Sequence, residues 1–254
     1  MGHQLIMQTL MEGARRWGIE LSAVQVEQFR LYYEDLVAWN KRINLTAITE
    51  PEAAQSRHFL DSLSLLRLNQ PHNGFYRWNG GPLLTVECRM ADVGAGAGFP
   101  GLALKIARPD LRLCLVESVG KKAVFLRHVA DSLGFEDVEI VVERAETLGR
   151  DVRYRNGFDV VLARGVAALR ALTELCLPLT RQGGFFVAYK KGQADDEVRD
   201  AQTALGLLGG QLCWKEEYEL PGMEGEHALL VIQKTSATPD RFPRQPGIPT
   251  KRPL

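Results

Sequence analysis

The chain has 254 residues, of which 45% are hydrophobic and 24% charged, and its formal net charge at pH 7 is zero. This size suits one large domain with an appendage. Because the net charge is zero, overall electrostatics do not single out nucleic acid as a partner, and any basic surface must come from local clustering. The sequence holds no run of eighteen apolar residues and no N-terminal apolar segment with a cleavage site, so neither membrane spanning nor secretion is expected.

Four cysteines (Cys88, Cys114, Cys176 and Cys213) lie far apart and form no CxxC pair. We expect them to be free thiols in a reducing cytoplasm, rather than a disulfide framework or a zinc site. The acidic run at 195–197 fits the start of a helix, where negative charge complements the helix dipole, so no metal is predicted there.

Residues 1–68 are typical of a helical N-terminal extension. Ser22 and Gln25 fit a capping box, and apolar residues follow at helical spacing. A second helical segment is expected after Pro51. Residues 69–88 are rich in Gly, Asn and Pro and predict a loop or an insertion.

From Arg89 onward, short apolar runs alternate with helical segments over residues 89–235. Helices are expected at 100–107, 121–133, 167–177 and 195–208, and the five strands around them begin with MADVG and end with GFFVAY. This alternation predicts an α/β fold with a doubly wound, mostly parallel sheet. Two further strands, joined by a turn around Gly222, bring the total to seven and make the last strand antiparallel.

The tail at 236–254 is rich in proline and basic residues. Because proline cannot continue a helix or pair within a sheet, we expect an extended basic arm without regular structure.

The stretch ADVGAGAGFPG at 91–101 places four glycines between a strand and a helix. Glycine allows positive φ and lets a ligand touch the backbone amides. The helix N-terminus that follows suits a nucleotide, a phosphate or a carboxylate. In an open α/β sheet, ligands bind at the carboxyl ends of the strands, so this loop predicts a ligand site.

The next strand ends in Glu117, nineteen residues past Gly98, where a carboxylate can accept both ribose hydroxyls of an adenosine-containing cofactor. GAGFPG also satisfies G-x-G-x-x-G, so these residues leave a nicotinamide dehydrogenase open. Asp92 before the first glycine and the antiparallel last strand favour S-adenosylmethionine. The residues therefore predict a nucleoside-cofactor domain, with a methyltransferase preferred.

Several separated stretches together resemble one family, the bacterial small-subunit (16S) ribosomal RNA guanine-N7 methyltransferases, RsmG or GidB. They are WNKRINLTAIT, RHFLDSL, DVGAGAGFPGLAL, VESVGKKAVFLR, ERAETL, ARGVAAL, YKKGQ and FPRQPGIPTKRP, which span residues 20 to 253 in the order of the family. The resemblance implies a class I, Rossmann-like methyltransferase domain behind a helical extension. It also implies S-adenosylmethionine as cofactor, and 16S rRNA or the small ribosomal subunit as partner of a monomeric protein.

The resemblance further implies the positions of the cofactor contacts. The glycine loop and Phe99 would lie against the methionine part, the acid at position 117 would hold the ribose, and Ala145 with Glu146 would line the adenine pocket. The expected cofactor residues are Gly94, Gly96, Gly98, Phe99, Glu117, Ser118, Ala145, Glu146 and Arg164.

Arg164 is also the expected catalytic residue. Guanine N7 carries a lone pair and no proton, so its methylation needs alignment rather than a general base. A donor on N7 would block attack, so Arg164 is expected to hold O6, a phosphate or the cofactor carboxylate. The residues expected to face RNA are Lys121, Arg144, Lys190 and Lys191, and binding through them would weaken with salt.

Other side chains have simpler interpretations. His58 and Asp61 predict a structural hydrogen-bonded pair on one helix, with a role for His58 at a lid or cofactor pocket as the alternative. Trp39, Tyr32 and Tyr33 are expected in the core between helices. Two other functions remain open: a small-molecule methyltransferase or dehydrogenase on the same fold, and a ribosome-assembly factor that senses the cofactor without catalysis.

Overall fold

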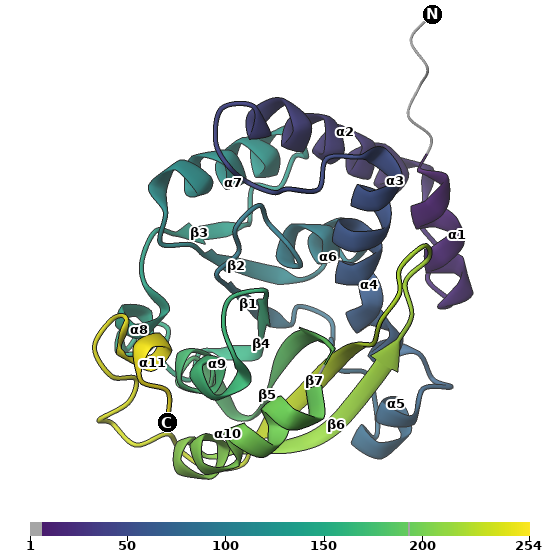
Figure 1. Cartoon of the computed structure of the whole chain (residues 1–254). Coiled ribbons are helices and arrows are strands. Elements are labelled where there is room, and N and C mark those ends of the chain that lie inside the picture. The colour runs from purple at the N-terminus through teal and green to yellow at the C-terminus, as the bar shows by residue number, and fades with distance from the viewer. Residues whose placement is uncertain (1–6, 193) are drawn as a thin grey trace, which may run out of the picture.

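The computed structural model describes residues 7–192 and 194–254; Gln193, the last residue of YKKGQ, lies outside them. A seven-stranded sheet with the order β3-β2-β1-β4-β5-β7-β6 forms the centre of the molecule (Figure 1). Neighbours are parallel from β3 to β5, whereas β7 is antiparallel to both β5 and β6, which confirms the predicted last strand. The strands are β1 (Arg89–Val93), β2 (Arg112–Val116), β3 (Glu139–Val141), β4 (Phe158–Arg164), β5 (Thr180–Lys191), β6 (Gly210–Tyr218) and β7 (His227–Lys234).

Helices cover both faces of the sheet, as the alternating pattern predicts. Successive β2 residues belong to opposite cores, because Leu113 packs on one face and Cys114 on the other. One core holds α6 (Gly101–Ala107) and α7 (Gly120–Ser132). The other holds α8 (Ala145–Leu148), α9 (Leu169–Cys176) and α10 (Ala194–Leu208). The four helices predicted from the sequence are thus confirmed, and α8 is an additional short one.

The strand order reverses between β1 and β4, which are hydrogen-bonded neighbours with Asp92 opposite Leu162. The carboxyl ends of β1 and β4 therefore lie side by side. The glycine loop follows one of them and the loop after Arg164 follows the other, so the topology brings these two segments together.

The N-terminal extension is helical, as predicted. It contains α1 (Gln8–Arg16), α2 (Ala23–Asn40) and a continuous helical segment made of α3 (Pro51–Ala54), η1 (Gln55–Leu60), α4 (Asp61–Leu63) and η2 (Ser64–Asn69). The Ser22–Gln25 capping box is present at the start of α2. In Figure 1 this extension lies over the end of the molecule that holds α6 and α7.

Residues 69–88 include one short helix, α5 (Gly74–Asn79), with Asn73 as its N-cap. Phe75 is buried there against Phe185 and Trp214. The segment therefore packs on the face of the sheet over β5 and β6, which flank β7.

The prediction of an extended arm without regular structure at 236–254 is wrong. Residues Ile248–Lys251 form α11, and Phe242 is buried in the core beneath α8 and α9. Proline at the second position of a short helix costs no hydrogen bond, because the first amides of a helix have no intrahelical acceptor. In Figure 1 the arm, in yellow, runs beside α8 and α9.

The four cysteines are free, as expected. Within residues 7–192 and 194–254, none of the helices combines the length and the apolarity that crossing a bilayer requires.

Candidate functional site

The glycine loop has the backbone that the sequence predicts. Gly94, Gly96 and Gly98 have φ angles of 74°, 59° and 93°, which only glycine adopts readily. Space is restricted as well, since a Cβ at Gly94 would lie 2.6 Å from Val166 Cγ2, and one at Gly98 would lie 2.4 Å from the Tyr32 hydroxyl. Gly96 has open space around it, with Gly94 O the nearest atom at 3.7 Å.

Most amides of the loop donate to acceptors within the protein. Gly94 N and Ala95 N donate to Val116 O at 2.9 and 3.1 Å, and Gly96 N donates to Glu117 Oε2 at 2.9 Å. The expectation that these amides are open to a ligand is therefore wrong. The bonds to β2 and Glu117 fix the loop, and the glycines let a ligand approach its backbone.

Asp92 lies directly before the loop and is fully buried. Its Oδ2 accepts a hydrogen bond from Gly101 N at 2.8 Å, while Oδ1 has no partner among the described residues. Burial raises the pKa of this carboxyl to about 7, against the opposing effect of the Gly101 amide. A cation bound nearby would stabilise the ionised form.

A hollow of about 220 Å³ opens at the carboxyl ends of β1 and β2. Three of its residues are predicted cofactor contacts that follow β2 and β3, namely Ser118, Ala145 and Glu146, and Gly94 belongs to it as well. Val166, Leu175 and Thr250 are also part of the wall. We call this the nucleoside hollow, because it lies at the carboxyl ends of the strands, where an open α/β sheet binds ligands, and because its lining is both polar and apolar.

Four predicted cofactor residues lie near the nucleoside hollow without lining it: Gly96, Gly98, Phe99 and Glu117. The two carboxylate oxygens of Glu117 accept from Gly96 N and from Val119 N, at 2.9 and 2.7 Å. Phe99 is stacked between Tyr32 and His58, with ring centroids 5.1 and 4.7 Å away. Its ring therefore joins the extension to the loop.

Arg164 ends β4, and the helical extension holds its side chain. Its Nη1 lies 2.7 Å from Asp61 Oδ2 and also donates to the carbonyls of Arg57 and His58, both at 3.3 Å. The guanidinium lies over the Phe99 ring, 5.2 Å from the centroid. Nη2 and Nε have no hydrogen-bond partner among the described residues, so these atoms can still donate.

A second hollow, of about 360 Å³, borders the segment 164–167: Arg164, Gly165 and Ala167 line it, whereas Val166 lines the nucleoside hollow. Asp61, Arg164, Tyr189, Tyr218 and His227 contribute polar groups to its wall. Asp61 Oδ1 accepts from the Tyr218 hydroxyl at 2.7 Å, and His227 Nδ1 is buried with no partner in the described residues. We call this the base hollow, because it is lined by aromatic rings and by unpaired donors.

The predicted hydrogen bond between His58 and Asp61 is wrong. His58 Nε2 instead contacts Thr46 Oγ1 at 2.9 Å and Ile48 O at 3.3 Å, and the Asp61 carboxylate is bound by Arg164 and Tyr218. Burial, together with the nearby Arg164 charge, lowers the pKa of His58 to about 4, so the ring is neutral at pH 7. Tyr32 is buried in the core, as predicted, and its hydroxyl donates to Ala97 O at 2.5 Å.

The four predicted RNA-facing residues have different surroundings. Lys121 is exposed in the first turn of α7, and Arg144 is exposed at the edge of the nucleoside hollow. Lys191 is exposed at the edge of the base hollow. Lys190, by contrast, is largely buried, with its ammonium 2.6 Å from Glu197 Oε2 and 3.0 Å from Ala167 O. Lys190 therefore fixes the segment before α9.

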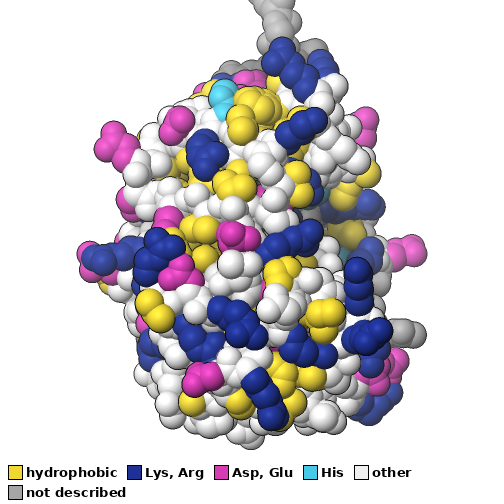
Figure 2. Space-filling view, turned by 90° about the vertical axis from the view of Figure 1, so that its left-hand side faces the viewer, with side chains coloured by type: hydrophobic (Ala, Val, Ile, Leu, Met, Phe, Trp, Pro, Cys, Tyr) yellow, Lys and Arg dark blue, Asp and Glu magenta, His cyan; other side chains and the backbone are white. Residues whose placement is uncertain are grey.

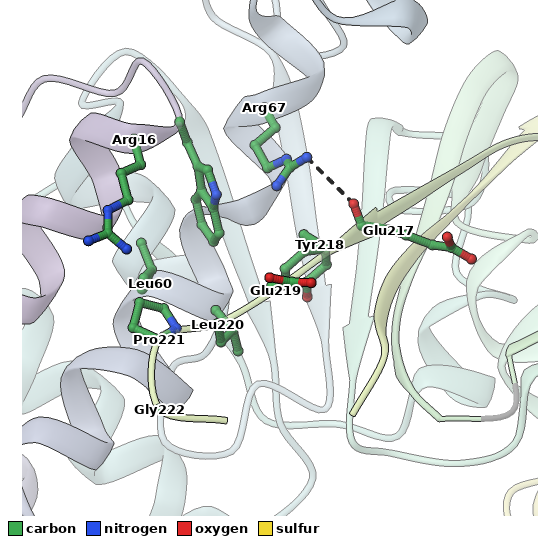
Figure 3. A pocket seen from close by; sticks show the side chains of 11 residues that line it. Arg16, Leu60, Arg67, Glu217, Tyr218, Glu219, Leu220, Pro221 and Gly222 are labelled. Atoms are coloured by element: carbon green, nitrogen blue, oxygen red, sulfur yellow. Dashed lines mark hydrogen bonds between the residues drawn. The ribbon is translucent and has the colours of Figure 1, made fainter. Parts of the chain in front are cut away.

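A third hollow of about 590 Å³ lies between α1 and the residues that follow β6 (Figure 3). Its wall includes Arg16, Trp17, Arg67 and Glu219, and it shares Tyr218 and Leu220 with the base hollow. The Arg67 guanidinium lies over the rings of Trp17 and Tyr218. Although it is the largest of the three, this hollow has no contact with the glycine loop.

The family model described as rRNA small subunit methyltransferase G (GidB) matches residues 25–217. The chain belongs to this family. It is 46% identical over 248 residues to the ribosomal RNA small subunit methyltransferase G of a Roseiflexus species, covering 98% of this chain and 100% of that protein. The protein of the same name from Lysinibacillus sphaericus is 43% identical over 247 residues, which cover 97% and 98% of the two chains. The family resemblance seen in the sequence is confirmed.

Among solved structures, a SAM-dependent O-methyltransferase from Thermotoga maritima has the same fold. The TM-score is 0.50 at 13% identity, with 82% of this chain and 73% of that chain covered. The class I methyltransferase fold is confirmed. No cluster of potential metal ligands occurs in residues 7–192 and 194–254.

Sequence reasoning missed Thr250, Tyr218 and His227 as residues of the hollows, and it treated Asp61 as structural. Thr250 lies in a proline-rich tail without periodicity, so no local pattern signals its position. The RHFLDSL stretch did contain a signal for Asp61, because a carboxylate on a buried helical face requires a charged partner.

Proposed function

We propose that this protein transfers the methyl group of S-adenosylmethionine to N7 of a guanine in 16S rRNA, in the bacterial cytoplasm. The observation that carries the proposal is the pair of hollows at the switch point of the sheet, separated by the segment that begins with Arg164. This geometry suits a donor and an acceptor that meet across one loop, and the membership of the chain in its family supports the same reaction.

Several groups fit the cofactor. We assign the adenosine part to the nucleoside hollow, with Ser118, Ala145 and Glu146 around it. The carboxylate of Glu117, held by Gly96 N and Val119 N, still has lone pairs for the ribose hydroxyls. The buried Asp92, with its unpartnered Oδ1, favours a positively charged group beside the glycine loop. When bound, S-adenosylmethionine supplies an electrophilic methyl group, which the N7 lone pair attacks in line as the sulfur leaves.

The guanine would enter the base hollow with its N7 edge toward the segment 164–167. We assign Nη2 of Arg164 to guanine O6, because Nη1 is occupied by Asp61. That contact orients the base and leaves N7 free. The aromatic rings of Tyr189 and Tyr218 provide apolar surface that excludes water from the reacting atoms. Catalysis consists mainly of alignment, since no proton has to leave N7 before it attacks.

RNA would bind through exposed basic residues around the two hollows: Lys121, Arg144 and Lys191. In the lower half of Figure 2, at the level of α8 to α11, Lys and Arg side chains are more frequent than Asp and Glu. This local excess provides a surface for phosphates although the net charge of the chain is zero. The third hollow, which adjoins the base hollow, offers room for nucleotides next to the target (Figure 3).

The experiment uses small ribosomal subunits and purified 16S rRNA from cells that lack the gene. Each is incubated with the protein and S-adenosylmethionine labelled at the methyl group, and label in RNA is counted. Transfer to RNA by the wild type, and loss of transfer in Arg164→Ala with unchanged binding of S-adenosylhomocysteine, support the proposal. Binding of rRNA without transfer to either substrate would indicate a non-catalytic assembly factor and overturn it.

A further inference from the structure

The C-terminal arm forms part of the wall of the nucleoside hollow. Thr250, on α11, lines this hollow together with the residues that follow β2 and β3. α11 packs on α9, which supplies Leu175 to the same wall. A segment expected to be an extended basic arm therefore lies at the site where the cofactor would bind.

One buried ion pair anchors the arm. Both carboxylate oxygens of Glu174 accept hydrogen bonds from Arg244, from Nε at 2.9 and 3.0 Å and from Nη2 at 2.6 Å. The backbone N of Arg244 also donates to Glu174, at 2.7 Å. The Glu174 side chain is 0% exposed, so its charge has to be compensated within the protein, and Arg244 is the residue that does so.

Further hydrogen bonds attach the arm on either side of this ion pair. Gly247 N donates to Glu146 Oε1 at 2.7 Å, and Glu146 itself lines the hollow. Arg155 donates from Nη1 to Phe242 O and from Nη2 to Thr238 O, both at 2.8 Å. These bonds hold the arm from residue 238 to residue 247, which leaves Thr250 only three residues beyond a fixed point.

We propose that the C-terminal arm is a built part of the adenosine site and that Thr250 contacts the adenosine group of the cofactor. The threonine hydroxyl can donate to and accept from a purine edge or a ribose hydroxyl. The inference rests on the proposed use of S-adenosylmethionine and adds a binding element that lies outside the Rossmann-like domain. If the docked arm strengthens ligand binding, the bound ligand must stabilise the docked arm to the same extent, because such coupling is reciprocal.

The test compares Thr250→Trp with Thr203→Trp, a matched control on an exposed position of α10. Calorimetry measures the binding of S-adenosylhomocysteine and of methylthioadenosine, which lacks the amino-acid part. We expect Thr250→Trp to weaken both ligands at least tenfold and by the same factor, and Thr203→Trp to leave both within twofold of wild type. Unchanged affinity in Thr250→Trp, or weakening of S-adenosylhomocysteine alone, would overturn the inference.

A second variant ends the chain at Gly247, which keeps the ion pair at Glu174 and removes α11. Its affinity for both ligands should also fall at least tenfold, with the far-UV circular dichroism of the wild type retained. In the full chain, S-adenosylhomocysteine should slow tryptic cleavage after Lys251, on α11. Cleavage that is independent of ligand would contradict the inference. Failure of wild type to bind either ligand would instead refute the proposed function.

Discussion

Arg164 at the end of β4 is joined to Asp61 of the helical extension by a contact of 2.7 Å between Nη1 and Oδ2. Both side chains are mostly buried, at 15% and 12% exposure, and Asp61 is in turn held by the Tyr218 hydroxyl. The extension thereby positions a residue of the methyltransferase domain between the two hollows. We therefore regard Asp61 as a positioning residue for Arg164.

Replacing Asp61 with Asn should lower the kcat of methyl transfer by roughly 10- to 100-fold, since misplacing an aligning group by about 1 Å has effects of this size. Binding of S-adenosylhomocysteine should stay within twofold, because Asp61 does not line the nucleoside hollow. Asp151→Asn, which removes the surface partner of Arg153, serves as control and should keep full activity. Equal losses of kcat and of cofactor affinity in Asp61→Asn would show that Asp61 acts on the whole fold.

Gly94→Ala should weaken cofactor binding more than its backbone strain alone explains. The positive φ of 74° costs roughly 1–2 kcal/mol for a non-glycine residue, and the new Cβ would also meet Val166. Gly80→Ala is a matched control, because Gly80 has a φ of 70° and no atom within 4 Å of a Cβ. Chemical unfolding should show the cost of the positive φ in both variants and a further loss of stability in Gly94→Ala from the contact with Val166. Calorimetry should show loss of cofactor affinity in Gly94→Ala alone. Normal affinity in Gly94→Ala would remove the loop from the cofactor site.

Lys191→Ala and Lys190→Ala should differ in what they change. Lys191 is exposed at the base hollow, so its loss should weaken binding to small subunits and reduce the slope of log affinity against log salt by about one. Lys190 is paired with Glu197, which also accepts from Leu169 N at 2.6 Å, so its loss should mainly lower thermal stability. Filter binding at several salt concentrations and thermal unfolding separate the two effects. If Lys190→Ala weakened binding to small subunits and Lys191→Ala lowered thermal stability, Lys190 would be the RNA contact.

The stability of the protein should depend on the ionisation of Asp92. The folded pKa is raised to about 7 from a model-peptide value of 3.8, so the folded state binds the proton more tightly than the unfolded state. The resulting stabilisation is complete below the unfolded pKa and is lost as the pH rises through 7. Between pH 5 and pH 8 this group should lower the free energy of unfolding by roughly 2–3 kcal/mol.

The measurement compares wild type with Asp92→Asn, which retains an oxygen acceptor for Gly101 N. Chemical denaturation at pH 5 and pH 8 gives the free energy of unfolding at each pH. Its decrease from pH 5 to pH 8 should be smaller for the variant than for wild type. An identical pH dependence in the two proteins would show that Asp92 does not titrate in this range.

The sequence predicted the sheet, its antiparallel last strand and the glycine loop, because each depends on local signals such as alternating apolar runs and positive-φ positions. The pairing of Asp61 with Arg164 could not be predicted, since the two residues are 103 positions apart and only the packing of the extension brings them together.

The docking of the arm was also not predicted. Prolines argue against long helices and strands, but they do not prevent a segment from being anchored by side chains such as Arg244. For the glycine loop, the predicted backbone shape is correct. The prediction that its amides are open to a ligand is wrong, because Val116 O and Glu117 become their acceptors only in the folded sheet.

The chemical identity of the methylated product shows whether the base hollow presents N7 of a guanine to the methyl group. Methyl-labelled rRNA from the transfer reaction is digested to nucleosides, and the labelled product is identified by liquid chromatography and mass spectrometry. We expect all label in 7-methylguanosine, and none after reaction with Arg164→Ala. Label in a ribose methyl group or in any other methylated base would show that the base hollow does not present N7, even if the protein binds cofactor and transfers methyl groups to RNA.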